Sequence, residues 1–298
     1  MNDITQTTED KPNTSTEPSS IVATQDAETR IREMARRSFL WGAAGVAGAV
    51  GAWRLLGAQE LSSGIAWPLR KVLGLNEKLA EIYFSGHRLA PEFTFTQITR
   101  DANSASGVRE NGNIGLGGDV GSDSWKLRVK GLYDMSRAVT IEEDNEPAVI
   151  LTLADIKALP RTTMVTEMKC IEGWSIVVQW TGTRFADFAA KYAPATRSGS
   201  APNITENPSD ILPYVGMETP DGGYYVGLDR DSALHPQTLL CYEMNGEPLA
   251  DAHGAPLRLA IPVKYGVKNI KRIGSIHFTA ERPKDYWAEQ GYDWYAGH

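Results

Sequence analysis

Through most of the chain, hydrophobic and polar positions alternate over short runs, and turn-forming residues separate the runs. This pattern is typical of strands of 4–8 residues joined by hairpins and tight turns. Residues 213–219 and 223–228 form one such pair, with the turn expected at Pro220-Asp221-Gly222. The remaining strands are predicted at 125–132, 138–141, near 151, at 162–170, at 175–182, before the Asn245-Gly246 turn, and twice within 255–281.

Helical spacing of apolar residues is found in fewer places. Residues 183–194 are predicted to form a helix that stops at Pro194, and a short helix with Asp155 in its first turn follows the strand near 151. Within 60–90, five apolar residues also fit one helix face: Val72, Leu75, Leu79, Ile82 and Tyr83. We expect this helix to pack across the main domain through that face.

Short mixed strands with few helices favour an α+β fold. We predict three regions: a polar N-terminus with an export signal (1–58), an N-terminal arm (59–104) and one oxidoreductase domain (105–298). The aromatic C-terminal stretch 285–298 is expected to pack over the body of that domain.

The N-terminal region resembles a targeting segment rather than a folded unit. Residues 1–30 are polar and nearly free of large apolar groups, so they cannot bury enough surface to fold. Arg36 and Arg37 then precede an uncharged, Gly- and Ala-rich run that ends at Trp53 and is shorter than a typical bilayer span. The arginine pair is similar to a twin-arginine export signal, with an ordinary secretory signal or a lone anchor as alternatives. We expect a periplasmic protein whose signal is either cleaved or retained as an anchor.

Composition excludes several functional classes. The net charge of -7 argues against a broad nucleic-acid-binding surface. The two cysteines, Cys170 and Cys241, form no disulfide framework and belong to no CxxC or HExxH motif. Redox chemistry would therefore depend on a cofactor held mainly by other residues.

Cys170 stands directly before an apolar strand, in the sequence Cys-Ile-Glu-Gly-Trp. A thiolate there could bind a soft or high-valent metal, although an inert buried cysteine and a catalytic nucleophile remain open. Glu172 would share a face with Cys170 in an extended chain and could donate protons or steer a substrate, or it is a surface acid. Trp174 either shapes a pocket or belongs to the core.

The most basic stretch of this acidic protein lies at 253–273 and is interrupted by Pro262 and Gly266. Basic side chains on a glycine-containing bend suit a phosphate or pyrophosphate, and a solvated strand edge is the alternative. The five basic residues are Arg258, Lys264, Lys268, Lys271 and Arg272. A Gly- and Asn-rich loop at 102–124 is a weaker signal, because it has neither a Walker lysine nor a clean GxGxxG motif.

Taken together and in order, the segments around Cys170, 213–219 and 235–273 resemble the molybdopterin-binding domain of the sulfite oxidase superfamily. The surround of Cys170 is most similar to the periplasmic methionine-sulfoxide reductase catalytic subunits. The resemblance covers about residues 105–285 and implies the sulfite-oxidase-type fold.

The resemblance also implies a set of site residues. Cys170 would supply one thiolate to a single molybdenum ion, beside the two dithiolene sulfurs of molybdopterin. Glu172 and Trp174 are our candidates for proton handling and pocket shape. The pterin and its phosphate would be held by Asn111, Ile114, Gly115, Thr219, His253, Arg258, Asn269, Ile270 and Lys271.

Three departures from the family pattern are visible. The first segment reads NGNIGLGG, without the aromatic residues usual in the reductases, so we expect a less aromatic pocket. His253 stands where the reductase commonly has Asn. We expect no immunoglobulin-like dimerisation domain and no haem domain, and hence a monomer that receives electrons from a separate partner.

The sequence therefore predicts an exported molybdenum-cofactor oxidoreductase that reduces a sulfoxide, small or in a protein, with electrons from a membrane haem or quinone-linked partner. One alternative is an oxidase of sulfite or another oxyanion, which would need an extra arginine at the metal, such as Arg109, Arg161 or Arg184. The others are a cofactor-free binding protein and a cysteine hydrolase.

Overall fold

The computed structural model describes residues 45–46, 48–51, 54, 61–62, 65–83, 88–101, 108–110, 112–118, 121, 124–140 and 146–298. The chain divides into two compact units, residues 1–60 and 61–298, and nearly all described residues belong to the second. Arg36, Arg37 and Asn111, for which we made predictions above, lie outside the described residues.

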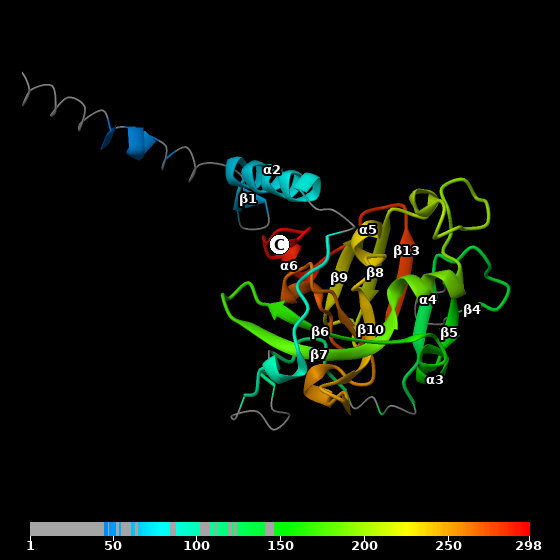
Figure 1. Ribbon diagram of the computed structural model, residues 1–298. Coiled ribbons are helices and arrows are strands. Elements are labelled where there is room, and N and C mark those ends of the chain that lie inside the picture. Colours follow the sequence, from blue (N-terminus) through cyan, green and yellow to red (C-terminus); the bar gives the residue numbers. More distant parts are fainter. Residues whose placement is uncertain are drawn as a thin grey trace, which may run out of the picture. The chain divides into compact units, whose positions relative to one another are not determined.

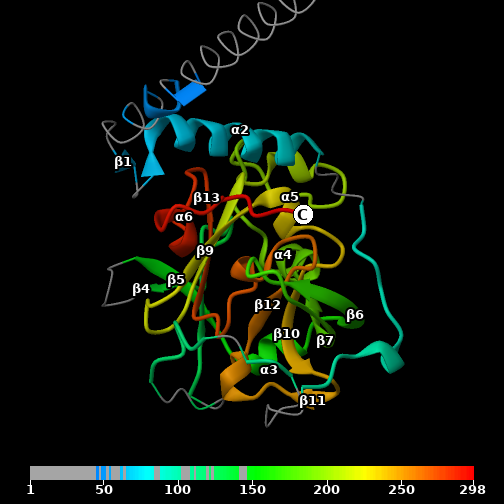
Figure 2. The ribbon, with the colours of Figure 1, turned by 90° about the vertical axis from the view of Figure 1, so that its left-hand side faces the viewer.

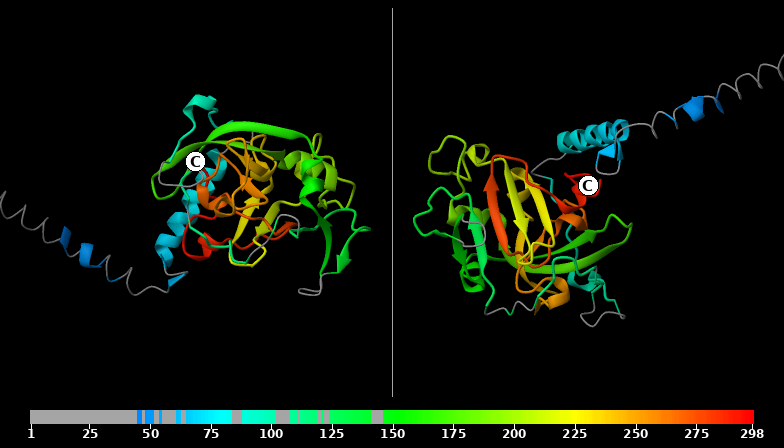
Figure 3. Two further views of the ribbon diagram at one scale, coloured as in Figure 1. Left: turned by 90° about the horizontal axis from the view of Figure 1, so that it is seen from below. Right: turned by 180° about the vertical axis from the view of Figure 1, so that it is seen from behind.

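A six-stranded mixed sheet forms one layer of the second unit. Its order is β4-β5-β3-β13-β8-β9, and only the β3–β13 pairing is parallel. Figure 3 shows β8, β9 and β13 side by side from behind, in yellow and red. The strands are β3 (Leu127–Lys130), β4 (Val139–Thr140), β5 (Pro147–Leu151), β8 (Tyr214–Glu218), β9 (Tyr225–Asp229) and β13 (Ser275–Thr279).

A second sheet is built around one long hairpin. β6 and β7 pair antiparallel from Arg161↔Thr183 to Lys169↔Ser175, and β10 pairs with β7 on its other side. Figure 1 and Figure 2 show this green hairpin running beside β10. The strands are β6 (Arg161–Lys169), β7 (Ser175–Arg184), β10 (Leu239–Met244), β11 (Glu247–Pro248) and β12 (Arg258–Ala260). A separate two-residue pair joins β1 (Leu61–Ser62) to β2 (Ile65–Ala66).

The helices are short, apart from α2. Thr152 caps α3 in a reciprocal capping box with Asp155, and α4 ends at Ala193 in a left-handed conformation just before Pro194. Among the described residues of the second unit, the helices are α2 (Trp67–Tyr83), α3 (Leu153–Lys157), α4 (Phe185–Tyr192), α5 (Arg230–Ala233) and α6 (Tyr286–Glu289), and the 3₁₀ turns are Phe95–Gln97, Pro208–Asp210, Asp251–His253 and Gly266–Lys268. The predicted α+β class with short strands and few helices is confirmed.

The prediction for the packing of the first long helix was wrong. α2 forms, but the five apolar residues expected to face the domain are exposed, by 55 % at Val72 and 81 % at Ile82. The half-buried side of α2 is mixed, with Leu73 and Ala80 beside Arg70 and Glu77, and Arg282 donates a hydrogen bond to Glu77 there. Helical periodicity located the stripe correctly but could not tell which neighbour the stripe meets.

Two apolar clusters make up the core. The larger contains Trp125, Phe185, Phe188 and Phe278 among 25 buried residues and joins the mixed sheet to α4. The smaller lies against β7 and β10 and includes Trp180 and Cys241. The hairpin β6–β7 therefore has a firmly packed base beneath the loop that carries Cys170.

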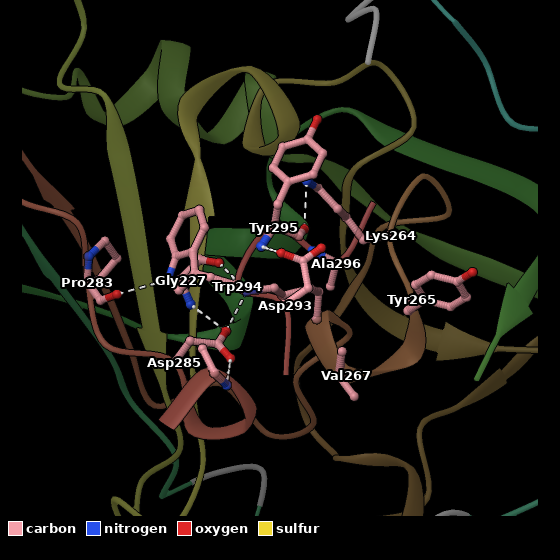
Figure 4. A network of polar contacts seen from close by, with 12 residues as sticks. Gly227, Lys264, Tyr265, Val267, Pro283, Asp285, Asp293, Trp294, Tyr295 and Ala296 are labelled. Atoms are coloured by element: carbon pink, nitrogen blue, oxygen red, sulfur yellow. Dashed lines mark hydrogen bonds and ion pairs between the residues drawn. The ribbon is translucent and has the colours of Figure 1, made fainter. Parts of the chain in front are cut away.

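The C-terminal stretch is held to the body by a buried polar network (Figure 4). Lys268 Nζ lies 2.5 Å from Asp285 Oδ2 and donates to the carbonyl of Gly227. Lys264 Nζ donates to the carbonyl of Tyr295 and lies over its ring. A side chain on Gly227 would collide with the ring of Trp294 at 2.6 Å, so only glycine permits this close packing. The predicted packing of 285–298 over the body is confirmed.

Candidate cofactor site

The loop between β6 and β7 places Cys170 at the end of the hairpin. The Cys170 N–H donates to the Trp174 carbonyl over 2.8 Å, and the Gly173 N–H donates to the Cys170 carbonyl. Gly173 has a φ of +87°, which closes the turn and is a conformation that favours glycine. The chain at Glu172 is therefore turned rather than extended, yet the turn still keeps Glu172 beside Cys170.

A cavity of about 180 Å³ opens beside Cys170. It collects side chains from the β6–β7 loop, from the 108–114 segment, from the 253–271 stretch and from the C-terminal stretch. Its lining includes Val108, Arg109, Ile114, Met168, Cys170, Glu172, Trp174, Trp180, Tyr224, Met244, His253, Arg258, Asn269, Lys271, Trp287 and Tyr292.

Burial is the main influence on the pKa of the Cys170 thiol. The residue is 6 % exposed, and burial raises its pKa above the ordinary value. A backbone hydrogen bond from Glu172 and the positive charge of Arg109 oppose this rise without cancelling it. A thiol held protonated in this way is a poor nucleophile, which disfavours the cysteine hydrolase.

Glu172, Trp174 and Arg109 form a connected group at the mouth of the cavity. Trp174 Nε1 donates to Glu172 Oε2 over 2.8 Å. The guanidinium of Arg109 lies 4.4 Å from the centre of the Trp174 ring. Of the three arginines considered for an oxyanion site, Arg109 lines this cavity, whereas Arg161 pairs with Glu243 and neither Arg161 nor Arg184 is among the lining residues.

The basic side of the cavity is formed by His253, Arg258 and Lys271. Burial and the charges of the other two lower the pKa of His253 to about 4, so its imidazole is neutral near pH 7. Burial lowers the pKa of Lys271 to about 8, helped by the charge of Arg258. Lys271 Nζ donates to the carbonyls of Gly112 and Ala252, each over 3.0 Å, and so joins two loops.

Arg258 is buried beneath the basic side of the cavity. Its two terminal nitrogens donate to the carbonyls of His253 and Asn269, and its guanidinium lies 4.7 Å from the centre of the Trp180 ring. Its Nε has no hydrogen-bond partner among the described residues. A buried donor left in this way is costly unless a ligand accepts from it, which is consistent with a bound anion.

The other basic residues of the 253–273 stretch lie elsewhere. Lys264 and Lys268 belong to the buried network with Asp229 and Asp285. Arg272 donates to the carbonyls of Gly118 and Ala255 and pairs with Asp251. Only two of the five basic residues that drew attention to this stretch therefore line the cavity.

Three predicted cofactor residues do not line the cavity. A side chain on Gly115 would meet Thr219 at 2.6 Å, so these two residues lie together; Thr219 Oγ1 donates to Asp221. Asp221 also accepts from the Gly117 N–H and so ties the first segment to the β8–β9 turn. Ile270 is fully buried, and its N–H donates to the Lys268 carbonyl.

Several lining residues escaped sequence reasoning. Tyr224, Trp287 and Tyr292 lie in stretches that we interpreted as a hairpin strand and a packing segment. The first segment contributes no aromatic side chain among its described residues, but five aromatic residues from elsewhere line the cavity: Trp174, Trp180, Tyr224, Trp287 and Tyr292. The sequence feature that could have revealed Trp287 and Tyr292 is the high aromatic content of 285–298. That content alone does not indicate which surface the rings face.

The donor set fits a molybdenum–pterin cofactor. Among the described residues, no group of three or more His, Cys, Asp and Glu could hold a metal ion by itself. A metal at the single Cys170 thiolate would therefore need other ligands that a cofactor brings with it. Arg258, Lys271 and neutral His253 suit the cofactor's phosphate and its heterocycle edge.

Comparison with known families decides the assignment. The model of the oxidoreductase molybdopterin-binding domain matches residues 117–287. The chain belongs to this family. It is a molybdopterin-binding oxidoreductase, and the predicted sulfite-oxidase-type fold is confirmed with it.

Curated relatives support the same assignment. The chain is 32 % identical over 220 residues to YedZ1 of Azospira oryzae, whose name assigns it provisionally as a protein-methionine-sulfoxide reductase subunit; the match covers 72 % of this chain and 70 % of the relative. It is 29 % identical over 253 residues to the protein-methionine-sulfoxide reductase catalytic subunit MsrP of Campylobacter jejuni, covering 83 % and 77 %.

Two further matches are partial. MsrP of Xanthomonas campestris pv. campestris is 31 % identical over 163 residues, covering 55 % of this chain and 47 % of the relative, so the chain spans about half of that protein. Among solved structures, the sulfane dehydrogenase SoxCD of Paracoccus pantotrophus matches with a TM-score of 0.42 and 16 % identity, covering 55 % of this chain and 40 % of that one.

Proposed function

We propose that this protein reduces a sulfoxide, of the methionine sulfoxide kind, at a molybdenum ion bound through Cys170. The observation that carries the proposal is the chemistry of the cavity beside Cys170. Met168, Trp174, Trp287 and Tyr292 present apolar surface there, which suits the carbon substituents of a thioether sulfoxide. The names of the MsrP relatives support the same substrate class.

The bound cofactor would supply oxygen-atom transfer coupled to a two-electron redox change. The overall reaction takes a sulfoxide, two electrons and two protons to a thioether and water. On the protein side, Arg109 is placed to donate hydrogen bonds to a polarised sulfoxide oxygen, and Trp174 holds the guanidinium in position. Glu172 is the carboxylate closest to Cys170 in sequence and orients the Trp174 ring through its hydrogen bond.

The phosphate of the cofactor would be held on the opposite side of the cavity. Among the described residues, Arg258 Nε is the unpaired donor on that side, and Lys271 and the neutral imidazole of His253 line the cavity beside it. The other residues implied by the resemblance, Asn111, Ile114, Gly115, Thr219, Asn269 and Ile270, stay predictions. Gly115 and Thr219 would act by shaping the loops behind the cavity rather than by lining it.

A second candidate function rests on Arg109. A guanidinium at the cavity mouth also suits sulfite or another small oxyanion, whose oxidation would run the same chemistry in the opposite direction. This alternative predicts strong dependence on Arg109, because a doubly charged substrate loses more from a missing cation than a neutral sulfoxide does.

The experiment compares sulfoxide reduction with sulfite oxidation on one preparation of the holoenzyme. Reduction of a methionine sulfoxide peptide by a reduced viologen is measured beside oxidation of sulfite with ferricyanide. We expect kcat/KM for the sulfoxide to exceed that for sulfite by about a hundredfold or more. The Arg109→Met variant should retain part of the sulfoxide reductase activity. Sulfite oxidation that is faster, and abolished in Arg109→Met, would support the second function instead.

We further propose that the protein acts in the periplasm, after twin-arginine export, with its signal either cleaved or retained. The support is the Arg36-Arg37 pair before an uncharged run. A membrane haem or quinone-linked partner would then deliver the two electrons that the reduction consumes.

A further inference from the structure

The exposed stripe of α2 does not belong to the cofactor site. It consists of Leu69, Val72, Leu75, Leu79, Ile82 and Tyr83, each at least 48 % exposed, with Asn76 as the polar residue among them. Such a run of large apolar side chains on one helix face is typical of a surface that something else covers. We propose that this stripe lies on the surface of a lipid bilayer that carries anionic headgroups.

The first argument is the distribution of charge around the stripe. Lys71 and Lys78, seven residues apart on the helix and both exposed, border one edge of the stripe. The acidic residues lie toward the body instead: Glu77 accepts from Arg282, and Glu81 is close enough to Arg282 and Lys264 to interact with their charges. The outward side of α2 is therefore apolar and basic, which is the pattern of an interfacial helix.

The second argument is the position of α2 in the chain. Only residues 54–66 separate the apolar run that ends at Trp53 from the first residue of α2. Thirteen residues span at most about 45 Å, so a retained N-terminal run would hold α2 close to the bilayer surface. None of the helices in the described part of the chain is both long enough and apolar enough to span a membrane. With charged residues along one side, α2 suits a position on the bilayer surface.

A second copy of the chain fits the stripe less well. Val72, Leu75, Leu79 and Ile82 do follow a coiled-coil spacing, but they cover only about two heptads, and stable pairing usually needs more. Lys71 and Lys78 lie at the flanking positions where antiparallel copies would bring like charges together. Lysines at a bilayer surface can instead extend toward phosphate groups while their stems cover apolar surface.

The test uses the full-length holoenzyme with an environment-sensitive dye on Leu75→Cys, because a local probe reports α2 even if the N-terminus inserts by itself. Phe95→Cys is the control, since Phe95 is 65 % exposed and lies outside α2. The unsubstituted chain, labelled in parallel, corrects for reaction at Cys170 and Cys241. Leu79→Cys repeats the measurement should Leu75→Cys fold poorly.

With vesicles of phosphatidylcholine and phosphatidylglycerol, we expect a blue shift at position 75, quenching by a quencher on the lipid tails, and no change at position 95. Lys71→Glu with Lys78→Glu should weaken the affinity for the vesicles, read from this signal in a lipid titration, by at least about fivefold per lysine. Position 75 behaving like position 95 overturns the proposal. A shift without vesicles that grows with protein concentration assigns the stripe to a second copy, and a shift with native membranes but not pure lipid assigns it to a protein partner.

Discussion

The two cysteines of this chain differ in their access to the cavity. Cys170 lies in a turn at the edge of a cavity, whereas Cys241 is fully buried among apolar residues of the smaller core cluster. Burial raises the pKa of Cys241 to about 12, so it stays a thiol at any physiological pH. Cys241 is therefore the natural control for every experiment on Cys170.

Lys271 is the residue whose charge changes closest to neutral pH on the basic side of the cavity. Its pKa of about 8 lies between that of His253, about 4, and that of Arg258, about 10. Since only the protonated amine attracts an anion, the affinity of this side of the cavity for an anion should be highest well below pH 8. It should decline as the pH rises through 8. For cofactor-free protein, sulfate binding measured by calorimetry should weaken by about tenfold from pH 7 to pH 9.

Sulfate serves as the probe because it does not titrate in this range. Lys271→Arg, which keeps its charge throughout, should bind sulfate almost equally at the two pH values. A decline of the same size in Lys271→Arg would show that Lys271 does not control the pH dependence.

Substitutions at the hydrogen bond between Glu172 and Trp174 can distinguish two roles of Glu172, proton handling and positioning of the Trp174 ring. Glu172→Gln keeps an acceptor for Trp174 Nε1 but removes the carboxylate, so a role in proton handling predicts a fall in kcat of about a hundredfold. Trp174→Phe removes the donor and should affect kcat/KM more than kcat, because the Arg109 position is disturbed. Both substitutions are near the surface, and thermal unfolding should shift little. Equal activity of Glu172→Gln and the wild type would leave Glu172 with a positioning role only.

At the scale of elements, the Lys268–Asp285 pair holds the C-terminal stretch against the loop that lines the cavity. Both side chains are almost fully buried, at 1 % and 3 % exposure. Asp285→Ala would leave the Lys268 ammonium without its carboxylate and also remove the cap of α6, and should cost about 3–5 kcal/mol in the free energy of unfolding. Arg161→Ala, which breaks the more exposed Arg161–Glu243 pair, should cost about 1 kcal/mol or less.

Denaturant unfolding of the two variants checks this prediction. Since Trp287 and Tyr292 reach the cavity from the same stretch, the Asp285→Ala protein should also lose cofactor more readily than Arg161→Ala. Similar unfolding free energies for the two variants would contradict the importance of the buried pair.

Local sequence patterns predicted the elements well where the determining contacts are local. The Asn245-Gly246 turn, the short helix with Asp155 in its first turn and the β8–β9 hairpin depend on residues within a few positions of each other, and all three form. The orientation of α2 and the destination of the 285–298 rings depend on partners outside the local sequence window: Arg282 lies 205 residues from Glu77, and Lys264 lies 31 residues from Tyr295. No periodicity contains that information, so one prediction was wrong and the lining rings were missed.

For the whole molecule, the proposed export route predicts where the protein is found. Arg36→Lys with Arg37→Lys should retain the folded, cofactor-loaded protein in the cytoplasm, because the export machinery reads this pair. Cell fractionation with immunoblotting measures this, and Lys11→Arg serves as a control in the polar N-terminus. Normal export of the double variant would exclude the twin-arginine route.

The candidate site was predictable from the sequence only in part, and the reason differs by residue. Cys170, Glu172 and Trp174 lie together because one turn holds them. Arg258 and Lys271 meet because the chain folds back between them, where the Leu259 N–H donates to the Ile270 carbonyl. Arg109 comes from a distant segment, and only the tertiary structure shows that it stacks on Trp174.

The central claim is that Cys170 binds molybdenum within a pterin cofactor. The most direct measurement is molybdenum per polypeptide, by elemental mass spectrometry with X-ray absorption at the metal, on wild type, Cys170→Ser and Cys241→Ala. We predict about one molybdenum per chain in wild type and Cys241→Ala, and in Cys170→Ser either loss of the metal or one sulfur ligand fewer. Wild-type protein without molybdenum from a cofactor-competent host, or unchanged sulfur coordination in Cys170→Ser, would contradict the claim.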